Sequence, residues 1–144
     1  MIRIFALLAL MVSPAMAEIK IQEVTSPGGI KAWLVENHDI PFTALDIRFQ
    51  GGSSLDAPGK RGAVNLMTAL LEEGSGELDA QGFAAARDGL AADFKFSSDV
   101  DGVDVSARFL TENQDKALDL LKGALVAPRF DPDAVERVRG QVLQ

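Results

Sequence analysis

Side chains that could carry metal or acid–base chemistry are few in this sequence. His38 is the only histidine and there is no cysteine, so the sequence cannot supply two histidines, or cysteines in their place, to a zinc ion. His38 follows a strand-like run and lies between Asn37 and Asp39. This position predicts a solvent-exposed turn residue.

Glu72 and Glu73 are the next candidates, because paired carboxylates can perform acid–base catalysis or bind a hard cation. Adjacent residues of a helix point about 100° apart, so the two carboxylates should not converge on one ligand. We expect a solvated helix end at this position.

Serine and glycine patterns also fall short of known site geometries. Ser53–Ser54 and Ser97–Ser98 have no histidine base in a recognisable arrangement, and "GSG" at 74–76 is not the G-x-S-x-G elbow. "PGGIK" and "GKRG" lack the spacing of a phosphate-binding loop. The residues by themselves therefore predict no self-sufficient catalytic site.

The composition narrows the class of protein. The chain has 144 residues, enough for a sizeable core, and a formal net charge of -7. A nucleic-acid-binding protein needs basic residues to neutralise phosphates, and an anionic membrane surface also attracts basic segments, so both kinds of partner are disfavoured. Without cysteine, an exported protein must be held by its core, which fits a bacterial periplasm.

The first 17 residues, "MIRIFALLALMVSPAMA", have the pattern of a secretory signal peptide. Arg3 is followed by a short apolar run, Pro14 ends it, and Ala15-Met16-Ala17 is a cleavage site. The apolar run is shorter than the roughly 20 residues of a membrane-spanning helix. We predict cleavage after Ala17 and export to the periplasm, with no membrane anchor.

The elements that would position any site alternate in type along the chain. Strand patterns are followed by two helical patterns, a strand pair joined near Asp101-Gly102, and two more helical patterns. Asp79 and Asp131 are expected N-caps, and Gly74 and Gly89 expected helix ends. These patterns predict an α+β fold of order βββααββαα, with a mostly antiparallel sheet packed by helices. The strands are expected within residues 18–26, 30–38, 42–53 and 92–110, the last range holding two strands. The helices are expected over residues 62–73, 78–90, 111–128 and 131–144.

The run "GGIKAWLVENHDIPFTALDIRFQGGSSLDAPGKRGAVNLMTALLEEGSG" resembles the N-terminal domain of the pitrilysin/insulinase family of zinc peptidases, which includes the mitochondrial processing peptidases. The family frame G-S-x-x-[DE]-x-x-G-x-x-G matches Gly52, Ser53, Asp56, Gly59 and Gly62. "FDPDAVERVRGQVLQ" is similar to the family helix that carries the third zinc ligand. The resemblance covers residues 19–144, and the sequence stops within that helix, so we expect residues 18–144 to be the N-terminal part of a longer peptidase-like protein.

The resemblance fails at the residues that do the family's chemistry. The family motif H-x-x-E-H supplies two zinc-binding histidines and a glutamate base. Asn65, Thr68 and Ala69 stand at these positions, and the third ligand would fall at or just beyond Gln144. The resemblance thus implies no catalytic residue and no metal on this chain, with zinc on a partner subunit.

One binding role is carried over from the family. In active members an edge strand after the second helix pairs with extended peptide substrate. The matching residues are Phe94, Lys95, Phe96 and Ser97. An ordinary sheet strand remains the alternative.

The resemblance implies a non-catalytic subunit of a periplasmic zinc metallopeptidase pair, which helps to form the substrate chamber for an active homologous partner. One alternative is a stand-alone peptide-binding or scaffold protein with a peptidase-like fold. Another is an active peptidase whose metal site comes from a later domain.

Overall fold

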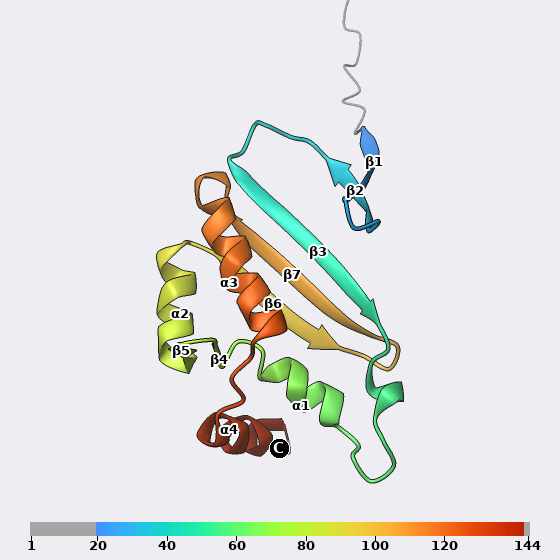
Figure 1. The fold of residues 1–144 in the computed structure, drawn as a ribbon, viewed down its shortest axis with the longest axis vertical. Helices are drawn as coiled ribbons and strands as arrows, with labels where there is room; N and C mark the ends of the chain where they lie inside the picture. Colours follow the sequence, from blue (N-terminus) through green and yellow to red (C-terminus); the bar gives the residue numbers. More distant parts are fainter. Residues whose placement is uncertain (1–19, 143–144) are drawn as a thin grey trace, which may run out of the picture. The chain divides into compact units, whose positions relative to one another are not determined.

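The computed structural model describes residues 20–142, and its contacts divide the chain into two compact units, Met1–Ile40 and Pro41–Gln144 (Figure 1). The predicted signal peptide lies outside the described residues. No helix within residues 20–142 has the length and apolar character needed to cross a membrane.

The first unit contains an antiparallel hairpin of β1 (Ile21–Thr25) and β2 (Lys31–Val35), which lie within two of the predicted strands. Gly29 adopts a positive φ of 86° in the turn, a conformation that glycine adopts without steric cost. Lys31 pairs with Glu23 across the strands at 2.9 Å. Trp33 is 83% exposed, so the hairpin by itself buries little apolar surface.

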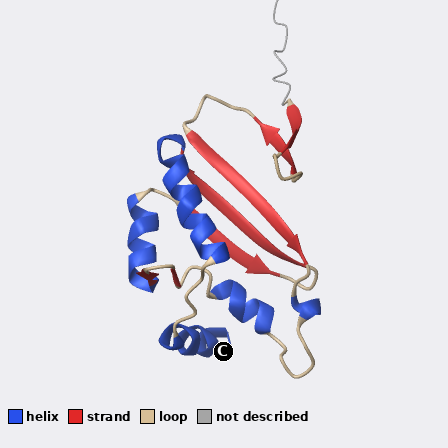
Figure 2. Cartoon of the chain, in the orientation of Figure 1, coloured by secondary structure: helices blue, strands red, loops and turns tan. Residues whose placement is uncertain are grey.

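The second unit is built on a three-stranded antiparallel sheet of order β3-β7-β6. Its strands are β3 (Phe42–Gln50), β6 (Asp93–Ser98) and β7 (Gly102–Leu110). Helices α2 (Ala80–Gly89) and α3 (Gln114–Val126) lie along one face of this sheet (Figure 2). Asp79 caps α2 as predicted, accepting a hydrogen bond from the Gly82 N–H at 2.8 Å.

The main core lies between this sheet and its two helices. Alternate residues of β6 and β7 point into it, because successive side chains of a strand face opposite sides. Phe83 of α2 is fully buried and its ring lies 6.4 Å from that of Phe94. The buried members of this core are Phe83, Ala92, Phe94, Val105, Ala107, Phe109, Ala117, Leu121 and Ala124.

A smaller apolar cluster joins α1 (Ala63–Ala69) to α4 (Pro132–Val142). Leu70, Ala134 and Val138 are its buried members. The helix predicted over 131–144 thus begins at Pro132, which suits the first turn because proline has no N–H to leave unpaired. Its last two predicted residues, 143–144, lie outside the described part of the chain.

The predicted α+β class is confirmed. The predicted order βββααββαα lacks two short strands that lie between α1 and α2, and the predicted end of the first helix is wrong. The helix expected over 62–73 ends at Ala69, and Gly74 does not cap it. Instead, Gly74 opens a short ribbon of β4 (Gly74–Ser75) and β5 (Leu78–Asp79). A Cβ on Gly74 would lie 2.9 Å from the Leu78 carbonyl oxygen, so the close approach of the two strands requires glycine.

Two short 3-10 turns were also not predicted, η1 (Ser53–Leu55) before α1 and η2 (Thr111–Asn113) before α3. The turn between β6 and β7 precedes Gly102, close to its predicted position. The 3-10 turns change only the connections between the predicted strands and helices.

Candidate functional site

The connection that leads into α1 is fixed by Asp56, the acidic residue of the family frame. Its carboxylate accepts hydrogen bonds from the N–H groups of Gly62 at 2.7 Å and Val64 at 3.0 Å. These N–H groups lie at the start of the helix, where no intrahelical acceptor exists. Gly59 and Gly62 have φ of 77° and 89°, so the spacing of acid and glycines specifies how this helix begins.

The three positions of the zinc motif lie on α1 in different environments. Asn65 is exposed, whereas Thr68 is only 2% exposed and its hydroxyl donates a 2.8 Å hydrogen bond to the Val64 carbonyl oxygen. Ala69 is half-buried and packs against the apolar cluster shared with α4. Two of the three positions therefore belong to the packing of the helix.

Glu72 and Glu73 follow α1, where we expected a solvated helix end. Glu72 is exposed, whereas Glu73 is half-buried. The Glu72 carboxylate accepts a hydrogen bond from Arg87 of α2 at 3.2 Å. Glu73 binds Arg137 of α4 through both of its oxygens, and its side chain is only 17% exposed. The two carboxylates diverge, as predicted, but each of them ties the end of α1 to another helix.

The pKa of the Glu72 carboxyl is raised above its usual value. Partial burial raises its pKa, the Arg87 guanidinium lowers it, and the nearby carboxylates of Glu73 and Asp93 raise it further. Burial and like charges outweigh the single cation here. The side chain is nevertheless paired with Arg87, which gives it a structural role.

Strand β6 lies at an edge of the three-stranded sheet. Within residues 20–142 it pairs with β7 alone, and its other side has no strand partner. Phe94 is buried and Phe96 half-buried against the core, while Lys95 and Ser97 are exposed on the opposite face. Helix α1 packs against β6, so the structure places the zinc-motif positions close to the predicted peptide-binding strand. Peptide binding by β6 stays a prediction.

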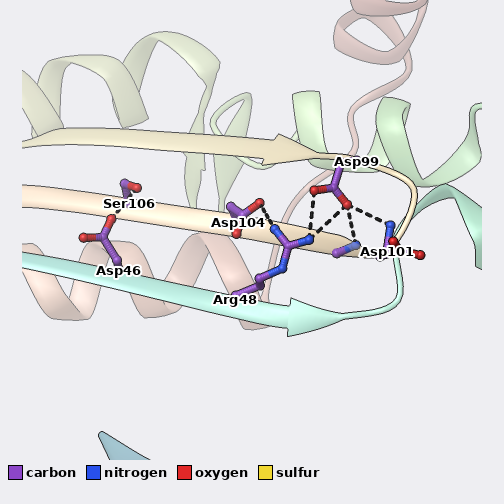
Figure 3. Close-up of polar contacts among 7 residues, drawn as sticks. Asp46, Arg48, Asp99, Asp101, Asp104 and Ser106 are labelled. Carbon is purple, nitrogen blue, oxygen red and sulfur yellow. Dashed lines mark hydrogen bonds and ion pairs between the residues drawn. The ribbon is translucent and has the colours of Figure 1, made fainter. Parts of the chain in front are cut away.

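A second polar cluster, which the sequence did not reveal, lies where β3 ends (Figure 3). Arg48 donates to Asp104 at 2.6 Å and to both oxygens of Asp99, at 2.8 and 3.1 Å. The Asp99 carboxylate also accepts from the N–H groups of Asp101 and Gly102. The hydrogen bonds from Arg48 are the main reason that the pKa of Asp99 is lowered.

This Arg48 cluster holds the β6–β7 turn against the chain that leads to α1. Backbone N–H groups of Gly51, Ser53 and Ser54 donate to the carbonyl oxygens of residues 101, 99 and 100 at 2.7 to 3.0 Å. The turn sequence "DVDG" is a sequence signal that could have pointed to Asp99, but nothing local pairs it with Arg48. We assign the cluster a structural role.

His38 lies in the first unit and is exposed, as predicted, with Nε2 3.7 Å from a carboxylate oxygen of Glu36. Glu36 is the one ion-pair partner of this imidazole among the described residues. Among residues 20–142, no group of three or more histidine, cysteine or acidic side chains has the geometry to hold a metal ion.

Comparison with known proteins identifies the family of the chain. Residues 31–144 match the model of the insulinase family, peptidase family M16. The chain belongs to this family. Within it the chain is a non-catalytic member, because Asn65, Thr68 and Ala69 replace the side chains of the motif.

Similar proteins include two that also bear non-catalytic descriptions. The chain is 33% identical over 108 residues to the "Non-peptidase homolog YmxG" of Helicobacter pylori, covering 75% of this chain and 25% of that protein. A crystal structure described as a peptidase M16 inactive domain from Pseudomonas fluorescens superposes with a TM-score of 0.80 at 30% identity, covering 87% of this chain and 31% of that chain.

A protease structure from Helicobacter pylori shares the fold, with a TM-score of 0.70 at 20% identity over 87% of this chain and 30% of that chain. The chain thus spans between a quarter and a third of the length of these relatives. The matches establish a family domain, and the activity of a whole protein is a separate question.

The zinc ion that the family implies does not fit the residues present. Ala69 has no ligating atom, and the Thr68 hydroxyl is buried and bonded to its own helix. An asparagine amide such as that of Asn65 is not among the usual protein ligands of zinc, which are thiolates, imidazoles and carboxylates. No catalytic step through zinc follows from α1 of this chain.

Proposed function

We propose that this protein is the non-catalytic subunit of a zinc metallopeptidase pair, and that it helps to form the substrate chamber for an active homologous partner. The observation that carries the proposal is the state of α1. Its capping frame at Asp56 and the glycines is intact, while Thr68 and Ala69 are committed to packing. A domain that keeps its shape without its chemistry fits a supporting subunit.

The open edge of β6 supports a contact with substrate. An unpaired strand edge exposes N–H and C=O groups and favours pairing with another chain, so natural proteins usually cover it or use it. Lys95 and Ser97 are exposed beside this edge and available to a peptide. In a pair of subunits, such an edge would help to hold an extended substrate near the zinc of the partner.

We further propose that the pair acts in the periplasm, because residues 1–17 have the pattern of a cleavable signal peptide. N-terminal sequencing of the protein isolated from periplasm should begin at Glu18. A mature chain that retains residues 1–17 and stays in the cytoplasm would contradict this location.

The test of the pair is affinity purification of the full-length protein from its native cells, with zinc content and peptidase activity measured on the eluate. We expect a homologous subunit with an intact H-x-x-E-H motif to co-elute with zinc and activity, and this chain alone to have neither. Zinc and activity in this chain alone would contradict our interpretation of Asn65, Thr68 and Ala69.

A second function, a stand-alone peptide-binding protein, also rests on the β6 edge. It is favoured if the protein elutes alone, free of zinc and inactive, yet binds unstructured peptides. Its exposed edge strand then acts without a catalytic partner.

A further inference from the structure

The contact between α1 and α4 contains an ion pair in which both oxygens of a carboxylate bind one guanidinium. Arg137 donates from Nη1 to Oε1 of Glu73 at 3.0 Å and from Nη2 to Oε2 at 2.5 Å. Both oxygens of the carboxylate therefore bind the guanidinium in a two-pronged, charge-assisted contact. The partners are 64 residues apart, so the pair connects two elements that the chain itself does not hold together.

Below this pair lies the small apolar cluster. Leu70, Ala134 and Val138 are buried in it, and Leu66 and Ala69 pack against it. Ala69 stands at one of the zinc-motif positions, so an apolar contact with α4 occupies a place where the motif would supply a metal ligand. The family helix that would bring the third ligand corresponds to α4.

We infer that the Glu73–Arg137 ion pair and the apolar cluster beneath it hold α4 on α1, as a link that needs no metal ion. In a zinc site with ligands on both helices, the ion itself would connect them. Glu73 cannot take over as a metal ligand while it is paired, because Arg137 occupies both of its oxygens. The inference concerns the packing of this chain and does not depend on the proposed pairing with an active subunit.

Partial burial makes the Glu73–Arg137 ion pair contribute more to stability than most surface ion pairs do. Exposed pairs contribute little, since solvent screens them and two flexible side chains must be ordered. The Glu73 side chain is 17% exposed and that of Arg137 50%. Removal of Arg137 would leave a largely buried carboxylate without its cation, which costs more than the loss of an exposed pair.

The test is hydrogen exchange of the α4 amides in the full-length protein, compared between wild type and R137Q. We expect the amides of α4 to exchange about tenfold faster in R137Q, as loss of hydrogen bonds to a charged group implies, with those of α2 and α3 unchanged. R139Q is the matched control, because it removes the same charge from an exposed site two residues further along α4. Exchange in R139Q should equal that of wild type.

A charge swap and a chelator complete the test. E73R/R137E should recover part of the protection lost in R137Q, and EDTA should leave wild-type exchange unchanged. Unchanged α4 exchange in R137Q, or faster α4 exchange of wild type in EDTA, would overturn the inference. Should R137Q fail to fold, R137K keeps the charge but loses the planar fork, and it should show a smaller acceleration confined to α4.

Discussion

Asp56 positions helix α1, whereas Thr68 stands at a catalytic position of the family motif. Asp56 caps α1 with two hydrogen bonds, so the start of this helix needs an acid or an equivalent acceptor there. The position of Thr68 matters for catalysis only when a glutamate occupies it. Here it holds a buried hydroxyl bonded to its own helix, which is compatible with a helix that only packs.

Asp99 gives a prediction at the scale of a single residue. Its pKa is lowered below the usual 3.8, first by the hydrogen bonds from Arg48. A carboxyl with a lowered folded-state pKa stabilises the fold above its unfolded pKa, and this stabilisation is lost as pH falls through the folded pKa. D99N should therefore be less stable than wild type at pH 7, and the difference should disappear at pH values well below 3.8.

Urea unfolding at a series of pH values measures this difference. D101N is the control, because it makes the same chemical change in the same turn, and among residues 20–142 the Asp101 side chain has no hydrogen-bond partner. A stability difference for D99N that stays constant from neutral to acid pH would contradict the role of its charge.

At the scale of elements, the connection from β3 to α1 shows how a helix is placed by a distant hairpin. Gly52 is buried against the β6–β7 turn, with a φ of -104° and a ψ of -133°. A Cβ there would lie 2.1 Å from the Asp99 carbonyl oxygen and 2.8 Å from the Gly102 nitrogen. Glycine is thus required by the close packing of backbone around this position.

G52A should lower the free energy of unfolding by about 1–3 kcal/mol, because a backbone shift must make room for the methyl group. G140A on α4 is the matched control. A Cβ at Gly140 meets nothing within 4 Å, so alanine should stabilise the helix by about 0.5–1 kcal/mol. Chemical denaturation of both variants measures the two effects. Equal stability of G52A and wild type would contradict the packing argument.

At the scale of the whole molecule, the larger of the two apolar clusters in the second unit lies against the three-stranded sheet. The core includes Phe83, which is fully buried and lies beside Phe94. Three strands with helices on one face supply the apolar burial that a two-stranded hairpin lacks. The hairpin of the first unit, with Trp33 and Ile30 exposed, shows the contrast.

F83A should lower the free energy of unfolding of the second unit by about 3–5 kcal/mol, through lost burial and the cavity that remains. F42A removes the same ring from a site 46% exposed and should cost much less. Thermal unfolding followed by circular dichroism compares the two variants. A loss of stability in F42A as large as that in F83A would show that this core is not the dominant one.

The sequence by itself determined the main strands and helices, and it showed that Asn65, Thr68 and Ala69 replace the side chains of the zinc motif. Period-two and helical patterns, the Asp79 cap and the turn at Gly29 act over a few residues, so they could be predicted locally. The tertiary structure decided where α1 ends, the partners of Glu72 and Glu73, and the Arg48 cluster. Arg48 meets Asp99 across 51 positions and Glu73 meets Arg137 across 64. Periodicity carries no information about such pairs, because they form only when folding brings distant elements into contact.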